Sequence, residues 1–141
     1  MTANLPASAG YSKRPLADKL GIKAGMRIAI LNAPDGYAET LGALPDGVQV
    51  LDGLEKNLDF VHDFVRARAA LEAKFPKLKE SLAPAGMLWI SWLKKSAKIS
   101  TDLDENIVRE VGLAHGLVDV KVAAVDSLWS GLKFVYRLKD R

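Results

Sequence analysis

Residues 28–37 constrain the fold of this chain more than any other segment. The first four are apolar without interruption, and Asn32 to Gly36 then supply the polar, proline and glycine residues of a tight turn. An unbroken apolar run of this length is typical of a strand covered on both faces, as in a parallel sheet. With a helix beginning at Tyr37, the segment forms a strand–turn–helix unit, which predicts an α/β domain.

The rest of the chain is predicted to alternate helices with strands and to close with a hairpin. Helices are expected at residues 13–20, 37–41, 66–82 and between the capping residues 101–105 and Gly116, and strands at 27–31, 48–51, 58–65, 87–92, 118–122 and 132–138, with 126–131 connecting the last two. Residues 58–65 could also begin a helix, but their β-branched and aromatic content favours a strand. Pro76 predicts a kink or a restart in its helix, and residues 84–86 predict that helix's end.

Together these elements predict a three-layer, Rossmann-like α/β sandwich. Its sheet should contain about six mostly parallel strands, with the second strand on one side of the first and later strands on the other. The C-terminal hairpin requires the last strand to run antiparallel to its neighbours.

Length and composition indicate a soluble globular protein. The 141 residues suffice for one domain with a sizeable core. We interpret residues 1–10 as a flexible tail and residues 11–141 as a single α/β domain. The absence of cysteine excludes disulfides, thiolate catalysis and cysteine metal sites.

Targeting and charge patterns exclude several partners. No apolar run approaches the roughly 20 residues of a membrane span, and the N-terminus lacks a signal pattern. We therefore expect a cytoplasmic protein without membrane contact. The net charge is +3, and the charges are unevenly spread: acidic residues dominate in 28–63, and basic residues dominate in 1–27 and 64–100. This patchwork is unlike a nucleic-acid binder.

Several stretches of the chain together resemble the bacterial domain-of-unknown-function family 3052. They are Tyr11–Leu16, Leu31–Tyr37, Leu88–Lys95, Thr101–Asp102, Gly116–Val122 and Trp129–Lys133. The resemblance extends from Tyr11 to Leu138, implies a bacterial protein and supplies no activity. A looser, fold-level similarity relates the order of elements, residues 82–88 and the final hairpin to the methyltransferase branch of Rossmann-like folds.

The turn after the first strand is a candidate cofactor site. Nucleotide and methyl-donor sites use glycines so that the backbone can approach the ligand, but here Gly36 is the turn's only glycine and Pro34 removes an N–H donor. Asp52 lies about twenty residues further on, where an acid can hold a ribose hydroxyl, although that acid and the glycine after it are equally a plain turn. Asn32 and Asp35 complete this set.

A second candidate site follows the strand at 87–92, because open parallel sheets bind ligands outside the carboxyl ends of their strands. Lys94 and Lys95 could meet a phosphate or carboxylate there together with Ser91, and Trp92 could stack on a planar ring. The alternative is a solvated loop with a tryptophan lid.

The bend of the final hairpin is the third candidate, with Asp126, Trp129, Ser130 and Lys133 around it. If the preceding strand is parallel to the others, the bend shares an edge with the first two candidates. Trp92 and Trp129 would then form one aromatic rim beside lysines, which is typical of a binding surface for a small ligand or another protein. The alternative is that both tryptophans seal the core.

The sequence predicts no catalytic residue and no metal ligand. His62 and His115 have no partner at metal-ligand spacing, and Ser91 has no evident base. His62 and Asp63 are neighbours on a strand, so their side chains are expected on opposite faces.

Three functional hypotheses remain. The sequence favours a non-catalytic module that binds a small anionic or aromatic ligand or another protein. The alternative is a methyltransferase-like enzyme dependent on S-adenosylmethionine, with Asp52 on the ribose and the Asn32 turn near the amino-acid part, although the missing glycines count against it. The third is a degenerate nucleotide-binding domain that serves as a subunit of a complex. The sequence establishes neither S-adenosylmethionine nor a nucleotide as cofactor.

Overall fold

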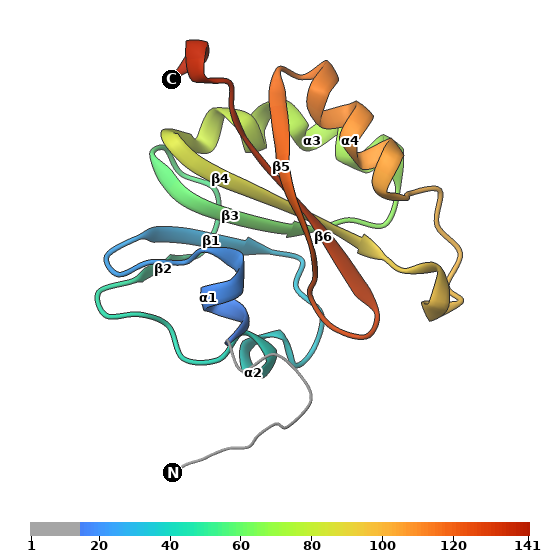
Figure 1. The fold of residues 1–141 in the computed structure, drawn as a ribbon, viewed down its shortest axis with the longest axis horizontal. Coiled ribbons are helices and arrows are strands. Elements are labelled where there is room, and N and C mark those ends of the chain that lie inside the picture. The colour runs from blue at the N-terminus through green and yellow to red at the C-terminus, as the bar shows by residue number, and fades with distance from the viewer. Residues whose placement is uncertain (1–14) are drawn as a thin grey trace.

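The computed structural model describes residues 15–141, which form a six-stranded sheet with helices on both faces (Figure 1). The elements are α1 (Leu16–Leu20), β1 (Arg27–Leu31), α2 (Tyr37–Leu41), β2 (Gln49–Leu51), β3 (Leu58–Phe64), α3 (Arg68–Ser81), β4 (Leu82–Leu93), α4 (Glu105–Ala114), β5 (Leu117–Ala124) and β6 (Trp129–Tyr136), with 3-10 turns at Lys95–Ala97 and Leu138–Asp140. The predicted tail at 1–10 and the predicted helix start at 13 lie outside the described residues. Among residues 15–141, no helix combines the length and apolarity needed to cross a membrane.

The strand order β2-β1-β3-β4-β6-β5 confirms the predicted Rossmann-like sandwich. β1 pairs in parallel with β2 and β3, and β3 pairs in parallel with β4. β6 is antiparallel to both β4 and β5, so the hairpin reverses the last strand as predicted. The carboxyl ends of β1 to β4 therefore meet at one edge of the sheet, which we call the carboxyl edge.

The sheet separates two apolar layers because successive residues of a strand face opposite sides. In β3, Phe60 packs in the layer of α1 and α2, whereas Val61 packs in the layer of α3 and α4, and both are fully buried. Burial on both faces explains the continuous apolar runs at residues 28–31 of β1 and 87–90 of β4. The second layer also receives α4, whose first turn is capped where the Asp104 carboxylate accepts a hydrogen bond from the Ile107 N–H at 2.8 Å.

α3 continues through Pro76, so the predicted restart is wrong. Proline lacks an N–H, which leaves the carbonyl four residues earlier without its helical partner. Both Pro76 and Glu72 are exposed, so water can satisfy that carbonyl and the helix persists.

Residues 84–86 lie inside β4, and the helix that they were predicted to end already stops at Ser81. Leu58 pairs with Leu82, yet Phe60 pairs with Met87, so the residues between form an irregularity in the strand. A Cβ on Gly86 would lie 2.5 Å from the Leu58 carbonyl oxygen, which explains the glycine. The turn-forming residues bend the strand locally without ending it.

The final hairpin is tighter than predicted, because β6 begins at Trp129 and only residues 125–128 connect it to β5. The Asp126 carboxylate accepts hydrogen bonds from the N–H groups of Leu128 and Trp129, each at 2.8 Å. Because this side-chain turn is tight, the connection ends at residue 128, three residues before the predicted end at 131.

Candidate functional site

The strand order reverses between β1 and β3: from β1 the chain continues to β2 on one side, and β3 then lies on the other side of β1. α2 lies between β1 and β2 in sequence and packs on one face, whereas α3 lies between β3 and β4 and packs on the other. Open α/β sheets bind ligands in the crevice that such a switch point creates outside the carboxyl ends of the strands. The turn after β1 and the residues at the ends of β2 and β3 therefore form the candidate site.

Asn32 bridges the ends of β1 and β3. Its φ of 58° is a left-handed conformation that asparagine tolerates better than most residues. Its Nδ2 donates to Asp63 Oδ1 at 3.0 Å, and Lys74 Nζ on α3 lies 3.0 Å from the second Asp63 oxygen. Asp63 is fully buried, so this amide and this ammonium compensate a charge that burial would otherwise penalise.

Open backbone and two carboxylates lie at the same edge. Gly36 has a φ of 84°, and no atom lies within 4 Å of the place where a Cβ would be; the space at Gly53 is equally open. β2 ends at Leu51, so Asp52 follows it directly beside β1, and both Asp52 and Asp35 are exposed. A ligand can therefore approach the backbone at Gly36 and Gly53. The exposed carboxylates of Asp35 and Asp52 can accept hydrogen bonds from hydroxyl groups of such a ligand.

The predicted aromatic rim is wrong. Trp92 is 6% exposed in the layer of α3 and α4, and Trp129 is 3% exposed in the layer of α1 and α2. Trp129 pairs with Leu93, so it shares the face of Leu93 and not that of the preceding tryptophan. Its ring meets that of Phe64 edge-on at 5.1 Å. The alternative interpretation holds: both tryptophans seal the core.

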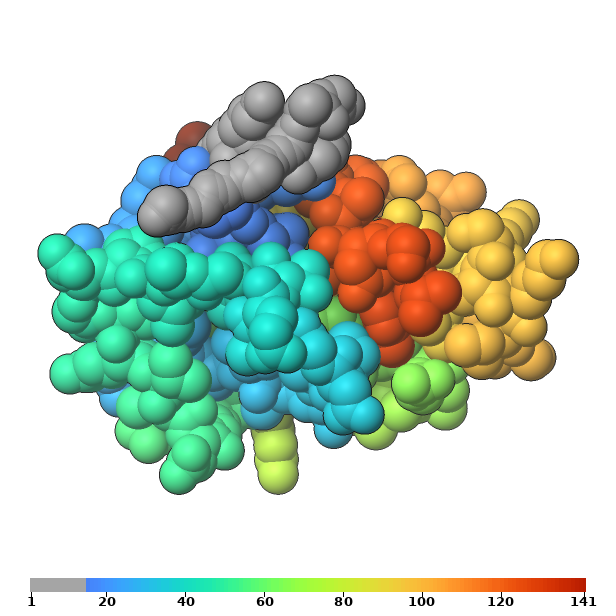
Figure 2. Space-filling view, turned by 90° about the horizontal axis from the view of Figure 1, so that it is seen from below, coloured from blue at the N-terminus to red at the C-terminus, as the bar shows by residue number. Residues whose placement is uncertain are grey.

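The two lysines after β4 do lie at the carboxyl edge, with different surroundings. Lys94 Nζ donates to the Asp126 carbonyl at 2.8 Å and ties its loop to the hairpin. Lys95 is exposed and lines a hollow of about 320 Å³ with the segment from Ile99 to Asp104. Ser130 is half-buried at the start of β6. Seen from below, the segments after β1 (cyan to teal), β5 (red-orange) and β4 (yellow) lie next to one another (Figure 2).

Lys133 does not lie at this edge. It pairs with Trp89 on one side and Lys121 on the other, in the interior of the sheet. The prediction placed it at the hairpin bend because the bend was assumed to reach residue 131.

Sequence reasoning missed a buried chain of polar side chains on the face of α2. Tyr37 OH lies 2.7 Å from His62 Nδ1, and His62 Nε2 lies 2.7 Å from Ser91 Oγ. Burial lowers the pKa of His62 to about 3 and raises the pKa of Tyr37, so both are neutral at physiological pH. Ser91 thus has a base in contact, contrary to the prediction, but it is fully buried. These hydrogen-bonded side chains therefore tie α2 to β3 and β4, and the buried Ser91 hydroxyl is not open to a substrate as a nucleophile.

His62 and Asp63 face opposite sides of β3, as predicted: one contacts Tyr37 of α2 and the other Lys74 of α3. The polar pair in the middle of a strand rich in apolar residues was the available signal for both buried clusters. The partners of each residue came from distant segments, which strand periodicity does not identify.

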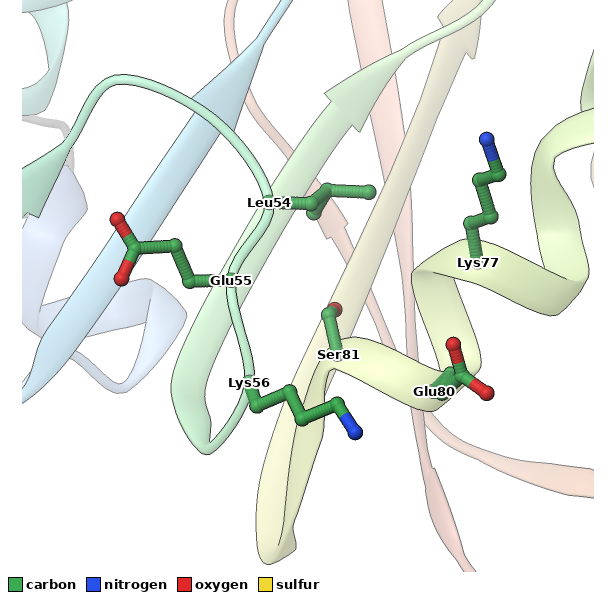
Figure 3. A pocket seen from close by; sticks show the side chains of 6 residues that line it. All are labelled: Leu54, Glu55, Lys56, Lys77, Glu80 and Ser81. Atoms are coloured by element: carbon green, nitrogen blue, oxygen red, sulfur yellow. The ribbon is translucent and has the colours of Figure 1, made fainter.

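Two other hollows lie at the opposite edge, where the parallel strands begin. One of about 230 Å³ lies between the β2–β3 connection and the end of α3 (Figure 3) and is lined by Leu54, Glu55, Lys56, Lys77, Glu80 and Ser81. The other, of about 440 Å³, is lined by Pro76, Lys79, Glu80, His115 and Tyr136. In residues 15–141, no three His, Asp or Glu side chains gather so as to hold a metal ion.

Solved structures share this fold at low sequence identity. A SAM-dependent methyltransferase from Aquifex aeolicus is 17% identical, with a TM-score of 0.56 over 83% of this chain and 85% of that one. A possible exported protein from Bordetella parapertussis is 14% identical, with a TM-score of 0.61 over 86% and 65%. Fibrillarin from Aeropyrum pernix, solved with natively bound S-adenosyl-L-methionine, is 14% identical, with a TM-score of 0.55 over 82% and 69%.

These likenesses show that the chain has the α/β fold of Rossmann-like methyltransferases. No family model and no curated protein matches the chain by sequence. The resemblance to the bacterial family of unknown function therefore stays a prediction.

Proposed function

We propose that this protein binds S-adenosylmethionine at the switch point between β1 and β3, as a member of the methyltransferase fold class. The observation that carries the proposal is the coincidence of an open turn after β1 and an exposed acid directly after β2. The same fold holds this cofactor in the fibrillarin structure.

The residues at the edge fit such a cofactor. Asp52 can accept hydrogen bonds from both ribose hydroxyls. The unobstructed backbone at Gly36 and Gly53 allows close approach of the ligand. The side-chain Nδ2 of Asn32 already donates to Asp63, which holds the turn in shape. The side-chain oxygen of Asn32 can then accept a hydrogen bond from the ammonium group of the cofactor's amino-acid part. When bound, the cofactor would supply an electrophilic methyl group.

A non-catalytic binding module is the second candidate, and one observation favours it. Two polar side chains at the ends of β1 and β4 are already paired, Asn32 with Asp63 and Ser91 with His62. The edge thus offers carboxylates and lysines for binding, with no paired nucleophile and base open to a substrate.

Ligand-dependent stability separates the two candidates. Calorimetric and thermal-shift titrations with S-adenosylmethionine and S-adenosylhomocysteine should show binding, and a ligand at one hundred times its dissociation constant should add about 2.7 kcal/mol to the free energy of unfolding. Asp52→Asn should weaken binding about tenfold, because an amide oxygen accepts less strongly than a carboxylate. Glu39→Gln, an exposed acid on α2, is the matched control and should bind as the wild type does.

The absence of any shift at millimolar cofactor would refute the proposal and leave the binding module. Equal weakening by Glu39→Gln would show a general charge effect and would refute the role of Asp52.

A further inference from the structure

Four lysines gather beside the C-terminal end of α1, on the face of the sheet that α1 covers. Lys19 and Lys23 come from α1 and the loop after it, and Lys121 and Lys133 come from β5 and β6. Lys121 Nζ donates to the Lys19 carbonyl at 3.2 Å, and Lys19 Nζ donates to the Ala124 carbonyl at 3.1 Å. Lys133 Nζ lies 4.0 Å from the place where a Cβ on Gly21, the residue that caps the end of α1, would be. We call these four residues the lysine cluster.

The lysine cluster places like charges on neighbouring strands and on the loop beside them. Lys121 and Lys133 are directly paired across β5 and β6, and like charges at such positions destabilise a sheet. Partial burial lowers the pKa of Lys133, and the charges of Lys121 and Lys23 lower it further. The arrangement therefore reduces the stability of the fold unless an anion compensates it.

Among residues 15–141, no ion pair compensates these charges, since none of the ion pairs found there includes a lysine of the cluster. Residues 1–14 contain no aspartate or glutamate.

Capping of α1 explains only part of the cluster. Lysines at a helix C-terminus hydrogen-bond the last carbonyls, and Lys121 does so. The α1 carbonyl at Leu20 is already taken by Trp89 Nε1 at 2.9 Å. Lys133 and Lys23 have no helix carbonyl among their hydrogen-bond partners in the described structure, so their charges need another explanation.

We propose that the lysine cluster binds the phosphate groups of a small molecule. Lysines bind phosphate as compact point charges. A phosphate group carries more negative charge than a carboxylate does, so it compensates several lysines at once. The site is independent of the proposed cofactor crevice, because S-adenosylmethionine carries no phosphate.

Isothermal titration with inorganic pyrophosphate, adenosine diphosphate and citrate tests the proposal on the full chain at low and physiological salt. Both phosphate compounds should bind, and citrate should bind at least tenfold more weakly. Lys133→Met should weaken phosphate binding about tenfold, whereas the exposed α3 substitution Lys77→Met should not. Tighter binding of the nucleotide would identify a nucleoside-linked phosphate, and equal binding a free one.

A second measurement uses the protein without ligand. In phosphate-free buffer, Lys133→Met should raise the melting temperature by relieving repulsion and desolvation, and pyrophosphate should then stabilise the variant less than the wild type. Citrate binding as tight as that of pyrophosphate, unchanged affinity in Lys133→Met or equal loss in Lys77→Met would each overturn the proposal. Asp52→Asn should leave pyrophosphate binding intact, so failure here and failure of the proposed cofactor site are separable.

Discussion

The buried histidine predicts how stability depends on pH. His62 has an ordinary pKa of 6.5 in the unfolded chain and about 3 in the folded protein, because burial between Tyr37 and Ser91 disfavours its charged form. Below pH 6.5 the unfolded chain therefore binds a proton that the folded protein excludes. The free energy of unfolding should fall as pH decreases from 6.5 toward 3, by at most 1.36 kcal/mol per pH unit from this residue.

Between pH 7 and pH 5 the expected loss from His62 is about 2 kcal/mol. This window avoids most carboxylate titration, so urea denaturation at several pH values in it measures the effect. His62→Gln keeps hydrogen-bonding capacity without a titrating group, and it should lose most of the pH dependence. An NMR titration of the wild type provides a check that needs no variant, because the His62 imidazole should not protonate above pH 5. A slope unchanged in His62→Gln, or protonation of His62 near its ordinary pKa, would refute the reasoning.

Three further predictions concern packing and capping. Trp129→Ala should reduce the free energy of unfolding by about 3–5 kcal/mol, since the ring is 3% exposed; a loss below about 1 kcal/mol in urea denaturation would contradict its role in the core. Gly112→Ala should reduce the free energy of unfolding by about 1–3 kcal/mol, because the new methyl group would overlap the Phe134 ring. In the matched control Gly53→Ala, the methyl group meets open space, so this variant should melt near the wild-type temperature. Asp104→Ala should remove about 1 kcal/mol by loss of the α4 cap, and circular dichroism melts that show no decrease would refute the cap's contribution.

The sequence predicted the elements best where local chemistry decides the structure. The bounds of β1 and α2 are confirmed at residues 27–31 and 37–41, because a continuous apolar run, a turn and a short helix succeed one another there. The reversal of the last strand is likewise confirmed, since two alternating strands joined by a short turn must be antiparallel.

Predictions failed where the result depends on register between distant strands. Trp92 and Trp129 were expected on one rim, but the pairing of Trp129 with Leu93 puts the two rings on opposite faces. The turn closed by Asp126 joins β6 to β5 and does not determine how β6 aligns with β4. A shift of one residue in that alignment would place both rings on one face. The contact between His62 and Ser91 depends in the same way on how β3 aligns with β4.

The candidate site was predicted only in part, because it too combines residues from distant segments. Asn32 and Asp52 were named because both follow strands, and the sheet order brings those strand ends together. Asp63 and Lys74 were missed, because only the packing of α3 on β3 shows that a buried carboxylate has its counterion there.

The reversed β6 lies between β4 and β5, although it is the last strand to be synthesised. Until it has left the ribosome, β4 exposes a long row of unpaired backbone groups over an apolar surface. β5, made earlier, has no strand to join. Completion of the sheet therefore waits for residues 129–136, and nascent chains stalled within the hairpin should need protection from aggregation.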